Sequence, residues 1–200
     1  NKALSEKRIT AEACIHHLWF TDADYNNKGT YIKWNPAVKT ERDRTAIRAA
    51  LLDGRIDVVA TDHAPHTVEE KNGKYFSAPS GGPLVQHGLP AMLDLVHQGV
   101  ISVERVVELM SHRVAECFQL ENRGYIREGY QADLVLVNPD AAWTVTGENI
   151  LYKCGWSPFT GHEFKSHVVG TWVNGTRVWN GVNILTENGN HAGQRLSFNR

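Results

Sequence analysis

Apolar residues gather in a short run at 56–60, and the pattern around this run predicts a buried strand. The run is rich in β-branched residues and lies between Gly54 and Pro65. Continuous apolar runs of this length are typical of strands that are covered on both faces, as in parallel sheets. Pro65 has no backbone N–H to donate to a neighbouring strand, so we expect the strand to end before it.

A helical period precedes this strand. Between residues 40 and 52, apolar side chains recur at intervals of three and four, and Thr40 with Asp43 can form a capping box at the start. Segment 10–20 is predicted to be another strand, and 31–34 a short extended segment. The order strand, helix, strand is the repeating unit of a parallel α/β sheet or barrel, so we expect the α/β fold class.

A long polar loop and further helices follow the buried strand. Residues 67–83 contain the sequence APSGGP and are predicted to form a loop without regular structure, with the length that lids and binding loops have. Helices are expected over 85–98, 102–111 and 114–120. Ser102 is a suitable N-cap for the second of these helices.

The pattern changes from Gly124 onwards, where apolar and polar residues alternate as in strands with one buried face. Asn174-Gly175 and Asn180-Gly181 stand between such runs, and Asn-Gly is a strong signal for a hairpin turn. We therefore predict two parts. Residues 1–123 form the α/β part with the polar loop, and residues 124–200 form a small β subdomain with the C-terminal tail.

Three titratable side chains gather where the strand at 56–60 is expected to end. Asp62, His63 and His66 fall within five residues of sequence. In α/β folds, ligands and catalytic groups collect at the carboxyl ends of the parallel strands. The alternative is that Asp62 caps the following turn and that the histidines are solvated loop residues. The density of titratable groups at this position favours a functional site.

Composition and charge narrow the classes of function. Apolar residues make up 42% of the chain, and the formal net charge is −1 with both signs interspersed. This leaves no electrostatic case for binding nucleic acid or an anionic membrane, and no apolar stretch is long enough to span a bilayer. Cys14, Cys117 and Cys154 are odd in number and widely spaced. We therefore expect reduced thiols and a cytoplasmic protein.

Four segments of the chain form recognisable motifs: ATDHAPHTVEEK at 60–71, EACIHHLWFTDADY at 12–25, KWNPAV at 33–38 and RGYIREGYQADLVLV at 123–137. They resemble segments of dihydroorotases, which are cyclic-amide hydrolases of the amidohydrolase superfamily. Ile15 and Ala37 stand where the family usually has proline. The resemblance covers nearly the whole chain in the family's order. The first segment is specific to the family, whereas Ala-Asp-Leu in the last is shared by many amidohydrolases.

The resemblance implies the C-terminal part of a (β/α)8 TIM-like barrel with a small β-sandwich subdomain. In this family an H-x-H pair, a carboxylated lysine or aspartate, two more histidines and a last aspartate hold two Zn²⁺ ions. Asp62 matches the last aspartate, and the sequence contains no H-x-H. We therefore expect that these residues alone bind no zinc pair. We also expect them to need the missing N-terminal portion of the enzyme, or a homo-oligomer, to cover exposed barrel edges.

The resemblance also implies roles for individual residues. Asp62 would be both a metal ligand and the catalytic group, while Asn35, His66 and the backbone of Ser80 and Gly81 would bind the small-molecule substrate. The implied reaction is the reversible closure of N-carbamoyl-L-aspartate to L-dihydroorotate in pyrimidine biosynthesis. The chemistry agrees, because a carboxylate can take up and return a proton and amide or imidazole N–H groups bind carboxylates. The alternatives are a turn position for Asn35 and a plain flexible loop at Ser80-Gly81.

Neighbouring polar residues are interpreted as structural. His16 and His17 are adjacent, and adjacent residues of a strand point to opposite faces, so at most one is expected at the site, as a packed or supporting side chain. His63 is expected to point away from Asp62 and to make a structural hydrogen bond. Residues 69–71 are expected to form a solvated loop face.

Three functions stay open at this point. The first is a zinc-dependent dihydroorotase, and the second is a hydantoinase or allantoinase, which keeps the barrel but acts on a different cyclic amide. The third is a dihydroorotase-like subunit that has lost its metals and serves in assembly. The second histidine of TDHAPH favours the first function, and the presence of Asp62, Asn35 and His66 argues against the third.

Overall fold

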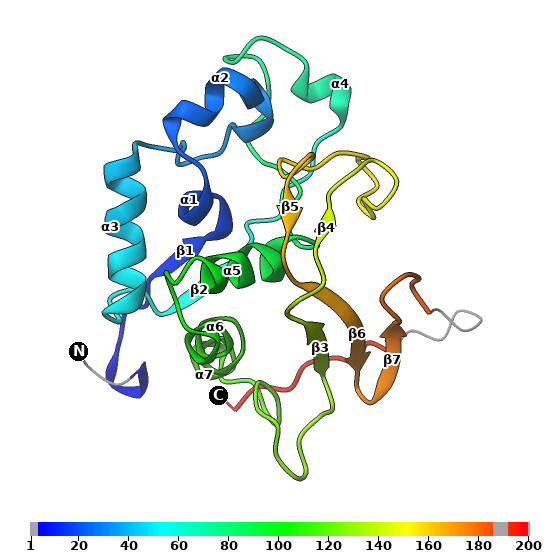
Figure 1. The fold of residues 1–200 in the computed structure, drawn as a ribbon. Helices are drawn as coiled ribbons and strands as arrows, with labels where there is room; N and C mark the ends of the chain where they lie inside the picture. Colours follow the sequence, from blue (N-terminus) through cyan, green and yellow to red (C-terminus); the bar gives the residue numbers. More distant parts are fainter. Residues whose placement is uncertain (1–3, 186–191, 200) are drawn as a thin grey trace.

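The structure is a computed structural model that describes residues 4–185 and 192–199. Strands β1 (Glu12–Cys14) and β2 (Val58–Ala60) form a parallel pair in which Cys14 lies opposite Ala60. Helix α3 (Glu41–Leu52) connects them, and Figure 1 shows the pair between α3 and α5. The predicted order of strand, helix and strand is thus confirmed.

Within the described residues, no helix has the length and apolar character that crossing a membrane requires.

The start of α3 follows its local sequence. The Thr40 hydroxyl accepts a hydrogen bond from the Asp43 N–H, and the Asp43 carboxylate accepts one from the Thr40 N–H at 3.1 Å. This is the predicted capping box, which satisfies N–H groups that lack partners in the first helical turn. Leu51 on the inner face of α3 is buried.

The segment after β1 differs from the prediction. The chain becomes helical at Ile15 instead of continuing as a strand, because Ile15 and Leu18, three residues apart, both enter the core. The predicted extended segment at 31–34 is also wrong in its first half. The helical elements here are α1 (Ile15–Trp19), η2 (Asp22–Asp24), α2 (Tyr25–Lys28) and η3 (Gly29–Ile32).

The predicted loop at 67–83 contains a short helix, α4 (Val68–Lys71), which begins with a capping box between Thr67 and Glu70. The three expected helices follow, and the Ser102 hydroxyl caps the second by accepting from the Arg105 N–H. A π-helical turn divides the second helix from the third. These elements are α5 (Gly88–His97), α6 (Val103–Val107), η4 (Glu108–His112) and α7 (Arg113–Phe118).

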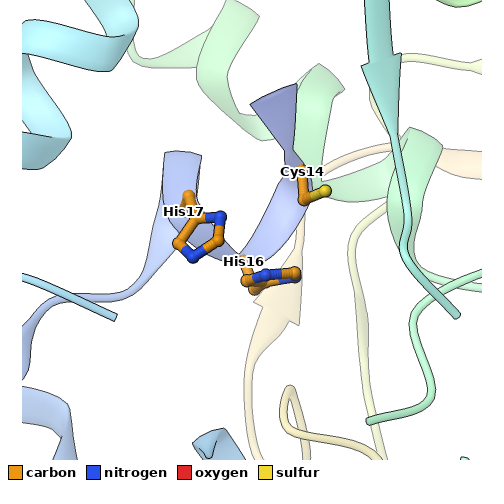
Figure 2. A group of neighbouring side chains, drawn as sticks. All are labelled: Cys14, His16 and His17. Atoms are coloured by element: carbon orange, nitrogen blue, oxygen red, sulfur yellow. The ribbon is translucent and has the colours of Figure 1, made fainter. Parts of the chain in front are cut away.

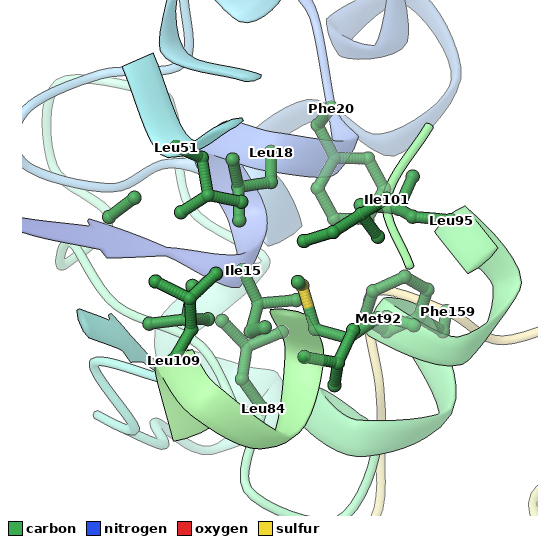
Figure 3. Close-up of a cluster of buried hydrophobic side chains, with 14 of the residues drawn as sticks. Ile15, Leu18, Phe20, Leu51, Leu84, Met92, Leu95, Ile101, Leu109 and Phe159 are labelled. Atoms are coloured by element: carbon green, nitrogen blue, oxygen red, sulfur yellow. The ribbon is translucent and has the colours of Figure 1, made fainter. Parts of the chain in front are cut away.

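One hydrophobic core joins these elements (Figure 3). Ile15 and Leu18 of α1 pack with Met92 and Leu95 of α5. The same core includes Phe159, which comes from beyond residue 124. The C-terminal half of the chain therefore helps to build the core under the parallel strands, and the predicted division at residue 124 stays a prediction.

The C-terminal strands form two small antiparallel sheets. One has the order β3-β6-β7, and Asn174 and Gly175 connect its last two strands with positive φ angles of 48° and 82°. This confirms the predicted hairpin at Asn174-Gly175, since both central residues of such a turn need positive φ. The strands are β3 (Leu134–Asn138), β4 (Trp143–Thr144), β5 (Glu163–Phe164), β6 (His167–Val173) and β7 (Thr176–Trp179), with β4 and β5 forming the other sheet.

Candidate active site

Asp62 lies two residues beyond β2, at the edge where β1 also ends. Its φ angle is 46°, in the left-handed region that aspartate tolerates better than most residues but that still costs energy. Its side chain is exposed. A strained, exposed aspartate at the carboxyl edge of parallel strands has the placement expected of a functional group.

His16, in the first turn of α1, is completely buried. Its ring stacks on Trp34 with 4.3 Å between centroids, and neither ring nitrogen has a hydrogen-bond partner among the described residues. Burial, with a contribution from His17, lowers the pKa of His16 to about 3. The ring is therefore neutral at pH 7 and offers a lone pair. Buried polar atoms nearly always have a hydrogen-bond partner. A buried imidazole without one among the described residues is therefore suited to bind a metal ion or another ligand.

Two further donor groups lie beside His16 (Figure 2). The Cys14 sulfur and ring nitrogens of His16 and His17 all lie within 4.8 Å of one another. The Nε2 of His17 donates to the Pro36 carbonyl at 2.9 Å, which leaves Nδ1 as its lone-pair nitrogen. Thiolate and imidazole are preferred zinc ligands. The donor set therefore fits a metal ion such as zinc, with His16 as the best-suited ligand.

The thiol of Cys14 is also close enough to Asp62 for the carboxylate charge to affect its pKa. Burial raises the pKa of Cys14 to about 12, and the charges of Glu12 and Asp62 add to this effect. A metal ion would have to displace the thiol proton before the sulfur could bind. The carboxylate predicted as a metal ligand and the cysteine–histidine group thus belong to the same strand edge.

The sequence interpretation of His16 and His17 is wrong in its geometry. It assumed a strand, in which adjacent side chains oppose one another. In a helix they are about 100° apart, so both can border one site. The signal that could have revealed this is the spacing of Ile15 and Leu18, which fits a helical face.

The turn at 79–82 lies along the segment that contains Asp62. His63 forms a parallel bridge with Gly82, and the Ala64 N–H donates to the Gly82 carbonyl at 3.2 Å. Gly81 has a φ of 126°, and a Cβ at this position would lie 2.5 Å from the Ala64 carbonyl oxygen. A glycine is therefore required for the turn to come this close.

His66 and Ser80 contact each other across this junction. The Nε2 of His66 donates to the Ser80 carbonyl at 3.1 Å, and its Nδ1 lies 3.4 Å from the Glu70 carboxylate. A carbonyl oxygen only accepts, so Nε2 carries the proton. The Gly81 N–H donates to the Lys33 carbonyl at 2.9 Å. Ser80 is therefore better placed than Gly81 to offer a backbone N–H to a ligand.

Asn35 is exposed between two residues that touch the histidine pair. Trp34 stacks on His16, and the Pro36 carbonyl accepts from His17. These contacts hold Asn35 beside the group. The structure thus brings all five predicted site residues to one region, and their roles stay predictions.

Two expectations about neighbouring residues can be compared with the structure. The Nδ1 of His63 accepts from the Leu84 N–H at 3.0 Å, so its predicted structural hydrogen bond is confirmed. The expected solvated face at 69–71 is wrong for Lys71, which is completely buried. Its ammonium group finds backbone carbonyls inside the protein, which sequence patterns do not reveal.

A pocket of about 360 Å³ opens beside His66. Its walls come from the segment after Asp62 and from residues 152–154 of the C-terminal half, including Lys153. The segment after Asp62 therefore borders a concave surface whose walls include imidazole, carboxylate and ammonium groups. Concave surfaces with a few polar groups on their walls are where small ligands bind.

Comparison with known proteins places this arrangement in a family. Residues 4–178 match the family described as Amidohydrolase family. The chain is 42% identical to a dihydroorotase of Halobacterium salinarum, over 92% of this chain and 44% of that protein. It is 32% identical to a dihydroorotase of Pyrococcus furiosus, over 94% of this chain and 43% of that protein. The chain thus spans less than half the length of these relatives.

Solved structures give the same result. An L-hydantoinase (dihydropyrimidinase) from Arthrobacter aurescens aligns with a TM-score of 0.85 at 29% identity, over 92% of this chain and 42% of that chain. A D-hydantoinase aligns with a TM-score of 0.83 at 25% identity, over 88% of this chain and 40% of that chain. The predicted fold class, part of an amidohydrolase barrel with adjoining β structure, is confirmed. Since the family match extends over most of its residues, this chain belongs to the amidohydrolase family.

Proposed function

We propose that the protein containing this chain is a dihydroorotase, which interconverts N-carbamoyl-L-aspartate and L-dihydroorotate. The observation that carries the proposal is Asp62, exposed and strained at the strand edge that also bears His16, whose ring nitrogens have no hydrogen-bond partner among the described residues. It lies within the segment that most resembles dihydroorotases. Relatives named dihydroorotase, at 32–42% identity, support the same assignment.

Asp62 is assigned the proton transfers of this reaction. Zinc, held by His16 with Asp62 and other ligands, would supply a water of lowered pKa. In ring opening, the Asp62 carboxylate takes the proton of the attacking water and returns it to the ring nitrogen that leaves. In ring closure the same carboxylate takes the proton from the carbamoyl nitrogen and passes it to the oxygen that leaves as water. One exposed carboxylate therefore serves both directions.

The remaining predicted residues are assigned to the substrate carboxylate. The Asn35 amide, the Ser80 N–H and the His66 ring can each donate to an anion. In the structure the His66 Nε2 donates to the Ser80 carbonyl, so it must turn or exchange partners before it contacts a ligand. Gly81 contributes the close approach of the turn to the Asp62 segment.

A hydantoinase is the second candidate, and the similarity to solved hydantoinases favours it. The two functions differ in the substrate. Dihydroorotate carries a carboxylate on its ring, whereas hydantoin and dihydrouracil do not. A site with several donors for a carboxylate disfavours the unsubstituted rings, because these donors would be left without an acceptor when such a ring binds.

Turnover of the three substrates tests the proposal. A full-length enzyme carrying this sequence, with zinc content measured, is assayed with dihydroorotate, dihydrouracil and hydantoin. We expect kcat/KM for dihydroorotate to exceed the other two by at least roughly 100-fold. Preference for hydantoin or dihydrouracil would establish the second candidate. Absence of all turnover in metal-loaded protein would favour the assembly subunit.

A further inference from the structure

Lys71, the last residue of α4, is buried, and no acidic side chain among the described residues pairs with it. Its side chain is completely buried, yet lysine is almost never fully buried unless it is paired. None of the ion pairs among the described residues involves Lys71. Its Nζ instead donates to the carbonyls of Pro79 at 3.0 Å and Gly81 at 2.8 Å.

This environment is costly for an ammonium group. Burial, followed by the charge of nearby Lys33, lowers the pKa of Lys71 to about 8. Lys33 is itself engaged, because its Nζ donates to the carbonyls of Tyr75 and Ala78, both at 2.6 Å. An apolar side chain of equal length would avoid this desolvation. The cost indicates that the two hydrogen bonds of Lys71 serve a purpose other than stability.

The hydrogen bonds of Lys71 hold the turn that faces Asp62. The Lys71 Nζ donates to the carbonyls of Pro79 and Gly81. The carbonyl between them, that of Ser80, accepts from the His66 ring. The same turn lies against the Asp62 segment through the Ala64 N–H and the Gly82 carbonyl.

Lys71 also reaches the other side of His66. Its Nζ lies 5.9 Å from the centre of the Trp156 ring, and the Trp156 Nε1–H donates to the His66 carbonyl at 2.8 Å. A cation over an aromatic face is attracted to it. One ammonium group therefore contacts the turn that bonds the His66 ring and the indole that bonds the His66 backbone.

We propose that Lys71 is a positioning residue that holds the Pro79–Gly81 turn and His66 in the geometry that receives the substrate carboxylate. The assignment rests on the proposed dihydroorotase function for its effect on substrate. Its effect on the turn stands on the contacts alone. Loss of the ammonium frees two carbonyls, and the turn then moves away from the Asp62 segment.

Lys71→Met in the full-length enzyme tests this, with Lys74→Met as the matched control, since Lys74 is exposed in the same loop. We expect amide hydrogen exchange of Gly81 and Ala64 to become about tenfold faster in Lys71→Met only. We also expect KM for dihydroorotate to rise about tenfold, with a smaller change in kcat. Lys71→Gln keeps hydrogen-bond donors on a shorter side chain. Its exchange rates and its KM should lie between those of the wild type and those of Lys71→Met.

The two measurements separate the possible failures. Exchange at wild-type rates in Lys71→Met would overturn the positioning role, whatever the substrate is. Faster exchange in an enzyme that does not act on dihydroorotate would support the role and reject the proposed function. Failure of both Lys71 variants to fold would make Lys71 a general structural residue and would also overturn the proposal.

Discussion

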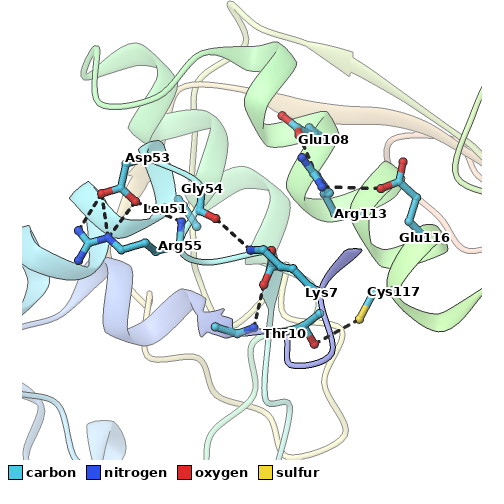
Figure 4. Close-up of polar contacts among 12 residues, drawn as sticks. Lys7, Thr10, Leu51, Asp53, Gly54, Arg55, Glu108, Arg113, Glu116 and Cys117 are labelled. Carbon is cyan, nitrogen blue, oxygen red and sulfur yellow. Dashed lines mark hydrogen bonds and ion pairs between the residues drawn. The ribbon is translucent and has the colours of Figure 1, made fainter. Parts of the chain in front are cut away.

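Charged groups at the two ends of the β1–β2 pair have opposite environments. At the amino end, Lys7 pairs with buried Asp57, whose other oxygen accepts from the Ala11 N–H at 2.9 Å. The Lys7 ammonium also donates to the Gly54 carbonyl at 3.2 Å (Figure 4). At the carboxyl end, Asp62 is exposed with a strained backbone.

His16, which follows β1 at the same edge, adds to this contrast. His16 is buried and has no partner for its ring nitrogens among the described residues. Polar groups that satisfy one another stabilise the fold, whereas polar groups held without partners can bind a ligand. In this strand pair the groups that satisfy one another lie at the start of the strands, and the candidate site lies at their end, where α/β folds collect functional groups.

Replacing the aspartate at the carboxyl end should have the largest effect. In the full-length enzyme, Asp62→Asn keeps the size of the side chain but cannot accept and return a proton. We expect kcat to fall by on the order of 10²–10⁴ in both directions of the reaction. Steady-state kinetics in each direction, with zinc content measured, checks this. Turnover within a few-fold of wild type would reduce Asp62 to a turn residue.

Buried His87 differs from His16 in that one of its two ring nitrogens has protein partners. The Nδ1 of His87 lies 3.1 Å from the Tyr152 hydroxyl and 3.0 Å from that of Ser157, and burial lowers the pKa of His87 to about 4. In the unfolded chain the pKa of this histidine is near 6.5. Between pH 6.5 and 4, His87 is therefore protonated in the unfolded state and neutral in the folded state. Stability should therefore fall as the pH falls from about 6.5 to 4, by about 1.4 kcal/mol per pH unit for this group.

Chemical denaturation at a series of pH values measures this slope. His87→Gln removes the titrating group and should flatten the slope by about the same amount. An unchanged slope in a folded variant would show that His87 is not the source.

The aspartate at the amino end should affect stability and not chemistry. Asp57→Asn leaves the Lys7 ammonium without its anion, and we expect the free energy of unfolding to fall by about 2 kcal/mol. Burial alone would raise the pKa of Asp57, but hydrogen bonds from Lys7 and the Ala11 N–H outweigh it and hold this pKa below its usual value. The stabilisation should thus persist at neutral pH and disappear as the pH falls through that lowered pKa.

The exposed ion pair of Asp53 and Arg55 provides the control for this variant. Asp53→Asn should leave the melting temperature unchanged, because exposed pairs contribute little. A loss of kcat in Asp57→Asn at full zinc content would contradict the separation of the two strand ends.

The smallest expected effect concerns substrate binding at the carboxyl end. His66→Ala removes a donor assigned to the substrate carboxylate, so KM should rise roughly tenfold while kcat changes less. Initial rates over a range of dihydroorotate concentrations separate the two constants. A fall in kcat equal to that of Asp62→Asn, with KM unchanged, would assign His66 to the chemistry instead.

Several features could be predicted from the sequence because their causes are local. The capping box of Thr40 and Asp43 and the Asn174-Gly175 hairpin depend on side chains a few residues apart. The placement of Asp62 after a buried strand follows from the apolar run and Pro65. The gathering of Asn35, His66 and Ser80 came from the family resemblance, and the structure brings them to one region.

The sequence pattern was thus sufficient to predict the strand, helix and strand around α3 and the place of Asp62 just beyond β2. The burial of His16, with no hydrogen-bond partner for its ring among the described residues, and the inward direction of Lys71 are evident only in the folded chain. Both depend on contacts with other segments, which the periodicity of the local sequence does not encode. Trp34 covers the His16 ring, and the carbonyls of the 79–81 turn replace water around the Lys71 ammonium.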